Sequence, residues 1–192
     1  MAETVNFVTT NQYKFELTQK YFEKHSSDRF TLVQYDLETP EIQDESEEMI
    51  ASHSALWVSQ QLGQMAIASD VGFHINTLNG FPGPFVKYAN KWLRPNDILN
   101  MMRSHTNRTA FFVDVLALAT PEGECKTFVT RTMGKIVDAE QIANVDWTMD
   151  ALFIPDGHSG TLHSMDDDER DSVWSNDAWD QLIALLDKAK NN

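Results

Sequence analysis

Two side chains between Ala66 and Tyr88 have the chemical types and the spacing that phosphate chemistry needs. Asp70 follows a short apolar run, MAIA, which predicts a buried strand that ends just before this carboxylate. Lys87 follows the rigid turn NGFPGP, in which the prolines fix φ and the glycines permit unusual backbone angles. A carboxylate at a strand end and a lysine beyond a stiff loop are suited to hold a metal ion and a phosphate. An acidic loop and an ordinary surface lysine would give the same spacing, so both interpretations stay open.

A second candidate for anion binding lies near the N-terminus. Polar residues from Thr9 to Lys14 separate a predicted strand, residues 5–8, from a predicted helix. Helix N-termini expose backbone N–H groups and favour anions, and a lysine in the first turn indicates an anion nearby. Asn11 or Thr10 as a simple N-cap explains the same residues equally well.

A third candidate is an aromatic side chain in a polar segment. Residues 143–157, ANVDWTMDALFIPDG, are expected to be loop-like, yet they carry Trp147, Asp150 and Phe153. A large aromatic in a polar loop can be a platform on which a base stacks. Packing on the core as a lid is the alternative, and spacing alone favours it.

The composition is that of an acidic globular protein. The chain has 192 residues, a hydrophobic content of 42% and a formal net charge of −14. This length suits one domain, or one domain in two lobes. The charge argues against binding to DNA or RNA backbones. A nucleotide bound with Mg²⁺ needs only a few local cations, so it remains compatible with an acidic chain.

The sequence carries few indications of where in the cell the protein resides. No apolar run approaches the roughly 20 residues that span a bilayer, so we expect no membrane partner. The N-terminus lacks the basic and apolar regions of a secretory signal. Cys125 is the only cysteine, which excludes an intramolecular disulfide and a cysteine zinc cluster. We therefore expect a cytoplasmic protein.

Hydrophobic periodicity predicts the elements that must position these residues. Strands and helices alternate early in the chain, and a strand hairpin and a terminal helix follow, which predicts an α/β fold with a mixed sheet. A pattern like a capping box, Ser164 to Asp167, predicts a helix start there. Predicted strands are 5–8, 30–37, 65–68, 109–120 and 126–133, and predicted helices include 49–62, 95–102 and 171–188.

Five motifs in order carry a resemblance to a known family. They are TTNQYK at 9–14, ASDVG at 68–72, LNGFPGPFVKY at 78–88, FIPDG at 153–157, and Met165 with Glu169-Arg170 ahead of Ser175. The chain thereby resembles the inosine triphosphate pyrophosphatase family, also called the Ham1 or non-canonical purine NTP pyrophosphatase family. The resemblance covers nearly the whole chain, so we expect residues 1–192 to form a single domain of this fold.

The resemblance implies a fold and a reaction. Members have a long central mixed sheet flanked by helices in two lobes, with the nucleotide in the groove between them. They split a purine nucleoside triphosphate into the monophosphate and pyrophosphate with Mg²⁺, and they are commonly homodimers. Hydrolysis at phosphorus needs a positioned water, a carboxylate beside it and cations for the developing charge.

The match also implies roles for individual residues. Asp70 would hold the metal and activate water, and Glu41 best matches the metal glutamate. Trp147 lies where an aromatic stacks on the base, and Asp150 matches a pocket aspartate. The residues expected to bind substrate are Thr9, Thr10, Asn11, Lys14, Lys87, Trp147, Asp150, Arg170, Asn176 and Asp177.

Several departures from the family pattern bear on function. Ser69 replaces the first of two adjacent acids, and the phosphate-binding lysine expected near Ser54 is missing. Arg170 lies where the family has a lysine. Asn176-Asp177 replaces a His-Arg pair that reads oxygen acceptors on hypoxanthine or xanthine.

The last departure predicts altered base preference. Arginine only donates hydrogen bonds and an ionised aspartate only accepts them, so Asp177 would suit an amino-bearing purine such as guanine. Alternatively, the terminal helix is shifted in register and both residues face solvent. A non-catalytic nucleotide-binding or regulatory protein that retains the fold is the rival to the enzyme. The retention of Asn11, Lys14, Asp70 and Lys87 favours the enzyme.

Overall fold

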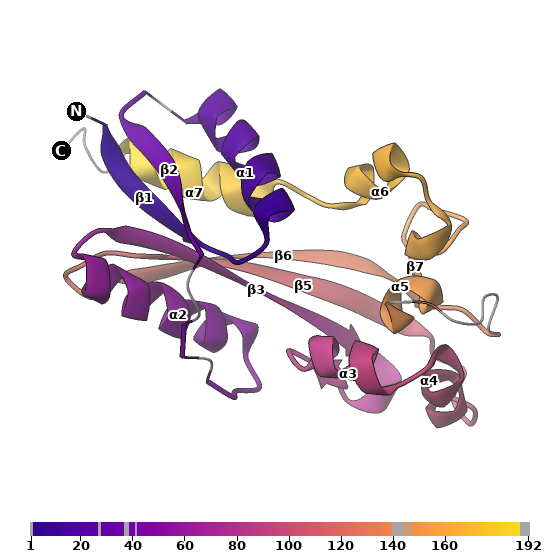
Figure 1. Ribbon diagram of the computed structural model, residues 1–192. Coiled ribbons are helices and arrows are strands. Elements are labelled where there is room, and N and C mark those ends of the chain that lie inside the picture. Colours follow the sequence, from indigo (N-terminus) through magenta and orange to yellow (C-terminus); the bar gives the residue numbers. More distant parts are fainter. Residues whose placement is uncertain are drawn as a thin grey trace. The chain divides into compact units, whose positions relative to one another are not determined.

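A mixed β-sheet is the framework of the computed structural model, which describes residues 2–26, 28–36, 39–40, 42–139, 145 and 147–188 (Figure 1). Its strands are β1 (Glu3–Val8), β2 (Phe30–Tyr35), β3 (Met65–Ile75), β4 (Pro82–Gly83), β5 (Thr109–Ala119), β6 (Cys125–Ile136) and β7 (Phe153–Pro155). Their order is β2-β1-β3-β5-β6-β7, with β4 beside β3. β1 runs parallel to β2 and β3, whereas β4 and β7 run antiparallel to β3 and β6. The predicted α/β fold with a mixed sheet is confirmed.

Helices connect and follow these strands. The α-helices are α1 (Gln12–His25), α2 (Glu47–Leu62), α3 (Val86–Trp92), α4 (Pro95–Met101), α5 (Thr148–Leu152), α6 (Asp167–Val173) and α7 (Asp177–Lys188). Two 3₁₀ turns, Asn76–Leu78 and Leu162–Ser164, complete the described elements. None of the helices that the structure describes combines the length and the apolar character that crossing a membrane requires.

The chain divides into two compact units. Unit 1 comprises Met1–Asp70, Val115–Thr130 and Asn176–Asn192. Unit 2 comprises Val71–Asp114 and Arg131–Ser175. The strands β3, β5 and β6 contribute residues to both units, since each is 11 or 12 residues long. The expectation of a single domain stays a prediction.

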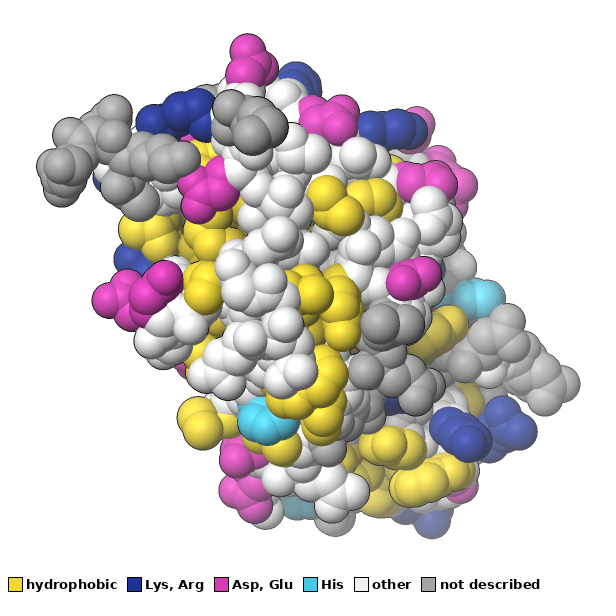
Figure 2. Space-filling model, turned by 60° about the vertical axis from the view of Figure 1, so that its left-hand side comes forward, with side chains coloured by type: hydrophobic (Ala, Val, Ile, Leu, Met, Phe, Trp, Pro, Cys, Tyr) yellow, Lys and Arg dark blue, Asp and Glu magenta, His cyan; other side chains and the backbone are white. Residues whose placement is uncertain are grey.

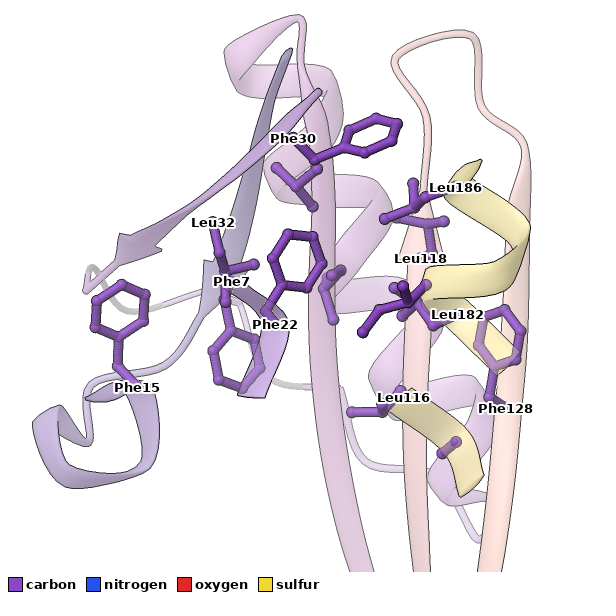
Figure 3. Close-up of a cluster of buried hydrophobic side chains, with 14 residues drawn as sticks. Phe7, Phe15, Phe22, Phe30, Leu32, Leu116, Leu118, Phe128, Leu182 and Leu186 are labelled. Carbon is purple, nitrogen blue, oxygen red and sulfur yellow. The ribbon is translucent and has the colours of Figure 1, made fainter. Parts of the chain in front are cut away.

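Unit 1 has a core of phenylalanine and leucine side chains (Figure 3). Phe7 of β1 and Phe22 of α1 are fully buried, and Trp179 of α7 packs edge-on against Phe7 with ring centroids 5.5 Å apart. Leu182 and Leu186 lie one helical turn apart on α7 and are buried in the same core. These leucines form the buried face of α7.

Unit 2 has an aromatic core of its own. The rings of Phe73, Phe112 and Phe153 pack together at centroid distances of 4.5 to 5.4 Å. Trp174 packs edge-on against Phe112 at 5.3 Å. Phe153 is fully buried, so this part of the FIPDG motif contributes to the core.

The prediction that a strand ends before Asp70 is wrong. β3 continues to Ile75, and Asp70 is its sixth residue. The continuation is stabilised because Phe73 and His74 pair with Gly83 and Pro82 of β4, and because Phe73 and Ile75 are fully buried.

The prediction of a loop at 143–157 is also wrong where the structure describes the segment. Thr148–Leu152 form α5 and Phe153–Pro155 form β7. The strand forms because Phe153 pairs with Ile136 across β6 and enters the core.

The terminal helix is two helices, not the one predicted from Asp171. α6 ends at Val173, and α7 begins at Asp177. The break coincides with Trp174, whose backbone is extended and whose indole packs on Phe112. The predicted helix start near Asp167 is confirmed, because α6 begins there. The capping residue is Asp166 and not Ser164, since the Asp166 side chain accepts from the N–H of Glu169 at 2.9 Å.

Hydrophobic side chains also reach the surface. Figure 2 shows several of them on one face, among acidic and basic groups. Trp92 is 70% exposed, and Met49 and Trp147 are each 55% exposed. Single exposed apolar residues are ordinary. Trp147 differs from the others because it is itself a candidate binding residue, so its exposure bears on function.

Candidate active site

The sheet brings together two segments of unit 1 that carry predicted site residues. β1 and β3 are parallel, and their residues Val8 and Ala68 are paired. The turn after β1 therefore lies beside the residues that follow Ala68. We call Asn11, Lys14, Ser69 and Asp70 the strand cluster.

The turn after β1 is held by its own hydrogen bonds. The Thr9 hydroxyl accepts from the backbone N–H of Asn11 at 3.2 Å, and the Gln34 side chain donates to the Thr9 carbonyl at 3.0 Å. Asn11 caps α1, because its side-chain oxygen accepts from the backbone N–H of Lys14 at 3.0 Å. The N-cap interpretation of Asn11 is confirmed, whereas Thr10 is an exposed residue that precedes the cap.

Ser69 is the partner of the N-terminal lysine. The Lys14 ammonium donates to the Ser69 hydroxyl at 2.7 Å, across 55 residues of chain. Lys14 also lies over the ring of Phe7, 6.0 Å from its centroid. Asp70 is the next residue along β3 and is half-buried. Ser69, where the family resemblance implies an additional acid, is thus a neutral acceptor that orients a cation.

A second group of predicted residues lies in unit 2. We call Trp147, Asp150 and Arg170 the helix cluster, because they belong to the short helices α5 and α6 or their caps. Trp147 is the N-cap of α5 and is 55% exposed, whereas Met149 and Phe153 of the same segment are fully buried. Its exposure leaves an indole face available for stacking.

Asp150 and Arg170 form an ion pair within this cluster. A guanidinium nitrogen of Arg170 donates to a carboxylate oxygen of Asp150, and a second nitrogen is 3.5 Å from the Leu162 carbonyl. The Asp150 side chain is only 13% exposed and that of Arg170 38% exposed. Burial raises the pKa of Asp150, and the charge and hydrogen bond of Arg170 oppose that rise.

Lys87 is an exposed residue in the first turn of α3, in unit 2. It belongs to a locally basic segment, because residues 71–113 contain five basic side chains and one acidic side chain in a chain of net charge −14. The basic residues are Lys87, Lys91, Arg94, Arg103 and Arg108. Such a segment favours a polyanionic ligand.

Asn176 and Asp177 are both exposed and belong to unit 1. The Asn176 carbonyl accepts from the N–H of Asp180, and Asp177 is the first residue of α7. A carboxylate in the first turn of a helix is favoured by the helix dipole, which is a sufficient structural reason for an acid at this position. A contact of either side chain with a base stays a prediction.

Part of the predicted metal site cannot be described. Glu41 lies outside the described residues, so its role as a ligand stays a prediction. Within the described ranges, no three His, Cys, Asp or Glu side chains converge as ready-made metal ligands. Ser54 lies in α2 and is half-buried.

Comparison with known proteins establishes the family. The sequence model of the Ham1 family matches residues 5–183. The chain belongs to the Ham1 family. It is 31% identical over 166 residues to the dITP/XTP pyrophosphatase of Methanopyrus kandleri, and the matched region covers 86% of each chain. It is 33% identical over 168 residues to that of Thermococcus kodakarensis, covering 87% of this chain and 88% of the relative.

Solved structures of Ham1 proteins share the fold. The Ham1 protein of Staphylococcus aureus superimposes with a TM-score of 0.80 at 21% identity, over 98% of this chain and 100% of that one. A HAM1 protein from Coxiella burnetii gives a TM-score of 0.78 at 20% identity, over 97% of this chain and 99% of that one. At these identities the likeness concerns the fold, and the site must be argued from this chain's own residues.

Proposed function

We propose that this protein is a Mg²⁺-dependent nucleoside triphosphate pyrophosphatase that converts a purine (d)NTP to the (d)NMP and pyrophosphate. Membership of the Ham1 family and the named dITP/XTP pyrophosphatases support the enzyme class. The observation that carries the proposal is the 2.7 Å contact between Lys14 and Ser69, beside Asp70. It holds a cation at the residue that precedes Asp70 in β3, and hydrolysis of a phosphate anhydride requires both a cation and a carboxylate.

The reaction assigns a task to each of these groups. Asp70 accepts a proton from a water molecule while the water oxygen bonds to the α-phosphorus. The bond between that phosphorus and the bridging oxygen breaks, and its electron pair leaves with pyrophosphate. Lys14 and Lys87 stabilise the negative charge on the phosphate oxygens as point charges.

The donor chemistry of this chain fits Mg²⁺. This ion is held in proteins by one or two carboxylates together with substrate phosphates and water. Asp70 and Glu41 would hold it, and the bound ion would neutralise phosphate charge and lower the pKa of a bound water. The hydroxyl of Ser69 is a neutral group that already binds Lys14, so the metal charge would be balanced by fewer acids than the family pattern provides.

The base preference is proposed to differ from that of the named relatives. Trp147 would stack on the purine, and Arg170, oriented by Asp150, would donate to the base or the sugar. Asp177 offers an acceptor where the family has a donor, which suits the N–H and NH₂ groups of guanine. The proposed substrate is therefore an amino-bearing purine nucleotide such as (d)GTP, in preference to ITP or XTP.

A nucleotide panel tests this proposal. Purified protein with Mg²⁺ is given dGTP, dITP, XTP and dATP, and the product is identified as pyrophosphate or phosphate. We expect pyrophosphate, a higher kcat/KM for dGTP than for dITP, and loss of activity with EDTA. A preference for dITP or XTP would contradict the base assignment alone, and no turnover would support the non-catalytic alternative.

A swap variant makes the base test sharper. Asp177→Arg restores a donor and is expected to shift the ratio of kcat/KM for dITP over dGTP upward by about tenfold. Asp171→Arg applies the same change of charge at an exposed position of α6 and should leave that ratio unchanged. An unchanged ratio in Asp177→Arg would mean that this residue does not contact the base.

We further propose a cytoplasmic homodimer, as the family resemblance implies. Light scattering of the purified protein measures the mass directly, and a mass near twice 21.9 kDa is expected. A mass of one chain at micromolar concentration would contradict the dimer.

A further inference from the structure

Two buried polar side chains converge on the start of α5 in unit 2. Buried polar or charged side chains are few among the described residues, and they are Asn6, Glu47, Ser59, Asn90, Thr148 and Thr161. Asn90 lies in α3 and is 8% exposed, and Thr148 is the first residue of α5 and fully buried. Burying polar groups is costly unless they form hydrogen bonds, so their partners indicate their role.

The two side chains join the end of α3 to the beginning of α5. The Asn90 side-chain oxygen accepts from the backbone N–H of Met149 at 3.0 Å. The Thr148 hydroxyl donates to the backbone carbonyl of Leu93 at 2.7 Å. Leu93 is the C-cap of α3, and Met149 is the second residue of α5. Thr148 of α5 thus satisfies the carbonyl at the end of α3, and Asn90 of α3 satisfies an N–H at the start of α5. Such terminal groups have no partner within their own helix.

This arrangement explains how a tryptophan can occupy the N-cap of α5. Ser, Thr, Asp or Asn usually fills that position, because the side-chain oxygen accepts from the N–H of the second or third helical residue. An indole has no acceptor, and Trp147 makes no side-chain cap bond. Asn90 supplies the missing acceptor from a different helix. The N-cap position is thereby left to an aromatic side chain that is 55% exposed.

We propose that Asn90 and Thr148 are positioning residues that hold Trp147 as a preformed stacking platform for the purine. The inference rests on the proposed function, in which Trp147 contacts the base. A helix of five residues is too short to hold its own conformation. Fixing its first turn from α3 means that less conformational entropy is lost when a base stacks, so binding is tighter.

The kinetic test separates positioning from chemistry. Asn90→Leu keeps the branched shape of the side chain and removes the acceptor, and Thr148→Val replaces the hydroxyl by a methyl group. Each is expected to raise KM for dGTP by about five- to tenfold and to change kcat by less than about twofold. Thr148→Ser retains the hydroxyl and should restore the wild-type KM.

The matched control is Ser59→Ala. Ser59 is a fully buried hydroxyl of unit 1 that donates to the Gln64 carbonyl at 2.7 Å, the same kind of bond at the same length as that of Thr148. If loss of any buried hydroxyl raised KM through general destabilisation, this variant would do so too. An equal rise of KM in Ser59→Ala would overturn the inference.

A double-mutant cycle identifies Trp147 as the residue through which Asn90 acts. In a Trp147→Ala background, Asn90→Leu should raise KM by less than about twofold, because the platform is already absent. The same five- to tenfold rise in both backgrounds would overturn the inference. Thr148→Val serves in the cycle if Asn90→Leu does not fold.

Fluorescence gives a readout that does not depend on turnover. The contribution of Trp147 is the difference between each protein and its Trp147→Phe counterpart. Its anisotropy should fall in Asn90→Leu and stay at the wild-type value in Ser59→Ala, and an unchanged anisotropy in Asn90→Leu would overturn the inference. Absence of pyrophosphate release from every nucleotide would instead overturn the proposed function, and the anisotropy alone would then decide whether Asn90 positions Trp147.

Discussion

The strand cluster and the helix cluster are built in different ways. Asn11 and Lys14 lie at the start of α1, just after β1, and Ser69 and Asp70 lie in the middle of β3, just beyond the residues of β3 that pair with β1. Trp147, Asp150 and Arg170 lie on helices of five and seven residues, where ion pairs and caps from other helices set their spacing. The difference indicates that the backbone positions the groups proposed for phosphate chemistry, whereas side-chain contacts position the groups proposed to read the base.

Substitutions in the two clusters should act on different kinetic constants. A change in the strand cluster removes a chemical group from a frame that stays in place, so it should act on kcat. A change in the helix cluster also alters the frame, so it should act on KM and on base choice. Ser69 stands where the family resemblance implies an acid. Its hydroxyl still accepts a hydrogen bond from Lys14, so the position of the lysine is kept.

The largest expected effect is that of Asp70→Asn. The amide keeps the shape of the side chain but cannot accept the proton of the attacking water, so kcat should fall by about 1000-fold. Affinity for dGTP with Mg²⁺, measured by calorimetry, should change by less than about tenfold.

Asp156→Asn is the control for this variant, because Asp156 is exposed. It should retain full turnover. Retention of turnover in Asp70→Asn would show that the strand cluster does not carry the chemistry, and the contrast between the two clusters would fail.

A smaller effect is expected from Asp150→Asn. Removal of the carboxylate leaves Arg170 without its ion-pair partner, and KM should rise by about tenfold while kcat stays within about twofold. Glu169→Gln is the control, since it weakens the more exposed contact between His158 and Glu169, 3.4 Å apart, and should change KM by less than about twofold. A fall in kcat without a change in KM would contradict the role given to the helix cluster.

The same variant has a pH signature. Burial raises the pKa of Asp150, so protonation of this carboxyl begins at a higher pH than for an ordinary aspartate. As the pH falls through that pKa, the pair with Arg170 weakens and KM should rise. Asp150→Asn should lack this rise, and an identical pH profile of KM in both proteins would exclude the pair from substrate binding.

The smallest effect concerns the first turn of α7, which carries Asp177. The Tyr21 hydroxyl donates to Asp180 at 2.5 Å, and burial together with this bond raises the pKa of Tyr21 to about 12. A raised pKa in the folded state means that the stabilisation is complete below pH 10 and is lost as the pH rises toward 12. Because the contact is exposed, its loss should cost less than about 1 kcal/mol.

Urea unfolding of wild type and Tyr21→Phe at pH 8 and pH 11 measures this contribution. Wild type should be the more stable at pH 8, and the difference should shrink at pH 11. Tyr35→Phe serves as the control and should show no such convergence. A difference that is independent of pH would mean that the bond to Asp180 does not hold the first turn of α7.

The outcome for the elements follows their packing. The patterns at 49–62 and 109–120 match α2 and β5 closely, because buried residues recur along the whole length of each stretch. The pattern at 171–188 does not show that α6 and α7 are separate helices, because Trp174 fits a helical periodicity and breaks the helix only by packing on Phe112. Asn90 likewise looks like an ordinary polar helix residue until Met149, 59 residues away, is beside it.

The sequence by itself determined the α/β fold class and the family, because periodicity and ordered motifs can be recognised along the chain, whereas it left the N-cap of the first helix open between Thr10 and Asn11. Only the tertiary structure decided that Lys14 donates to Ser69, that Asp150 pairs with Arg170 and that Asn90 caps the helix beginning at Thr148. Each of these contacts joins residues 20 to 59 positions apart. Such contacts depend on which strands and helices become neighbours, and no local pattern contains that information.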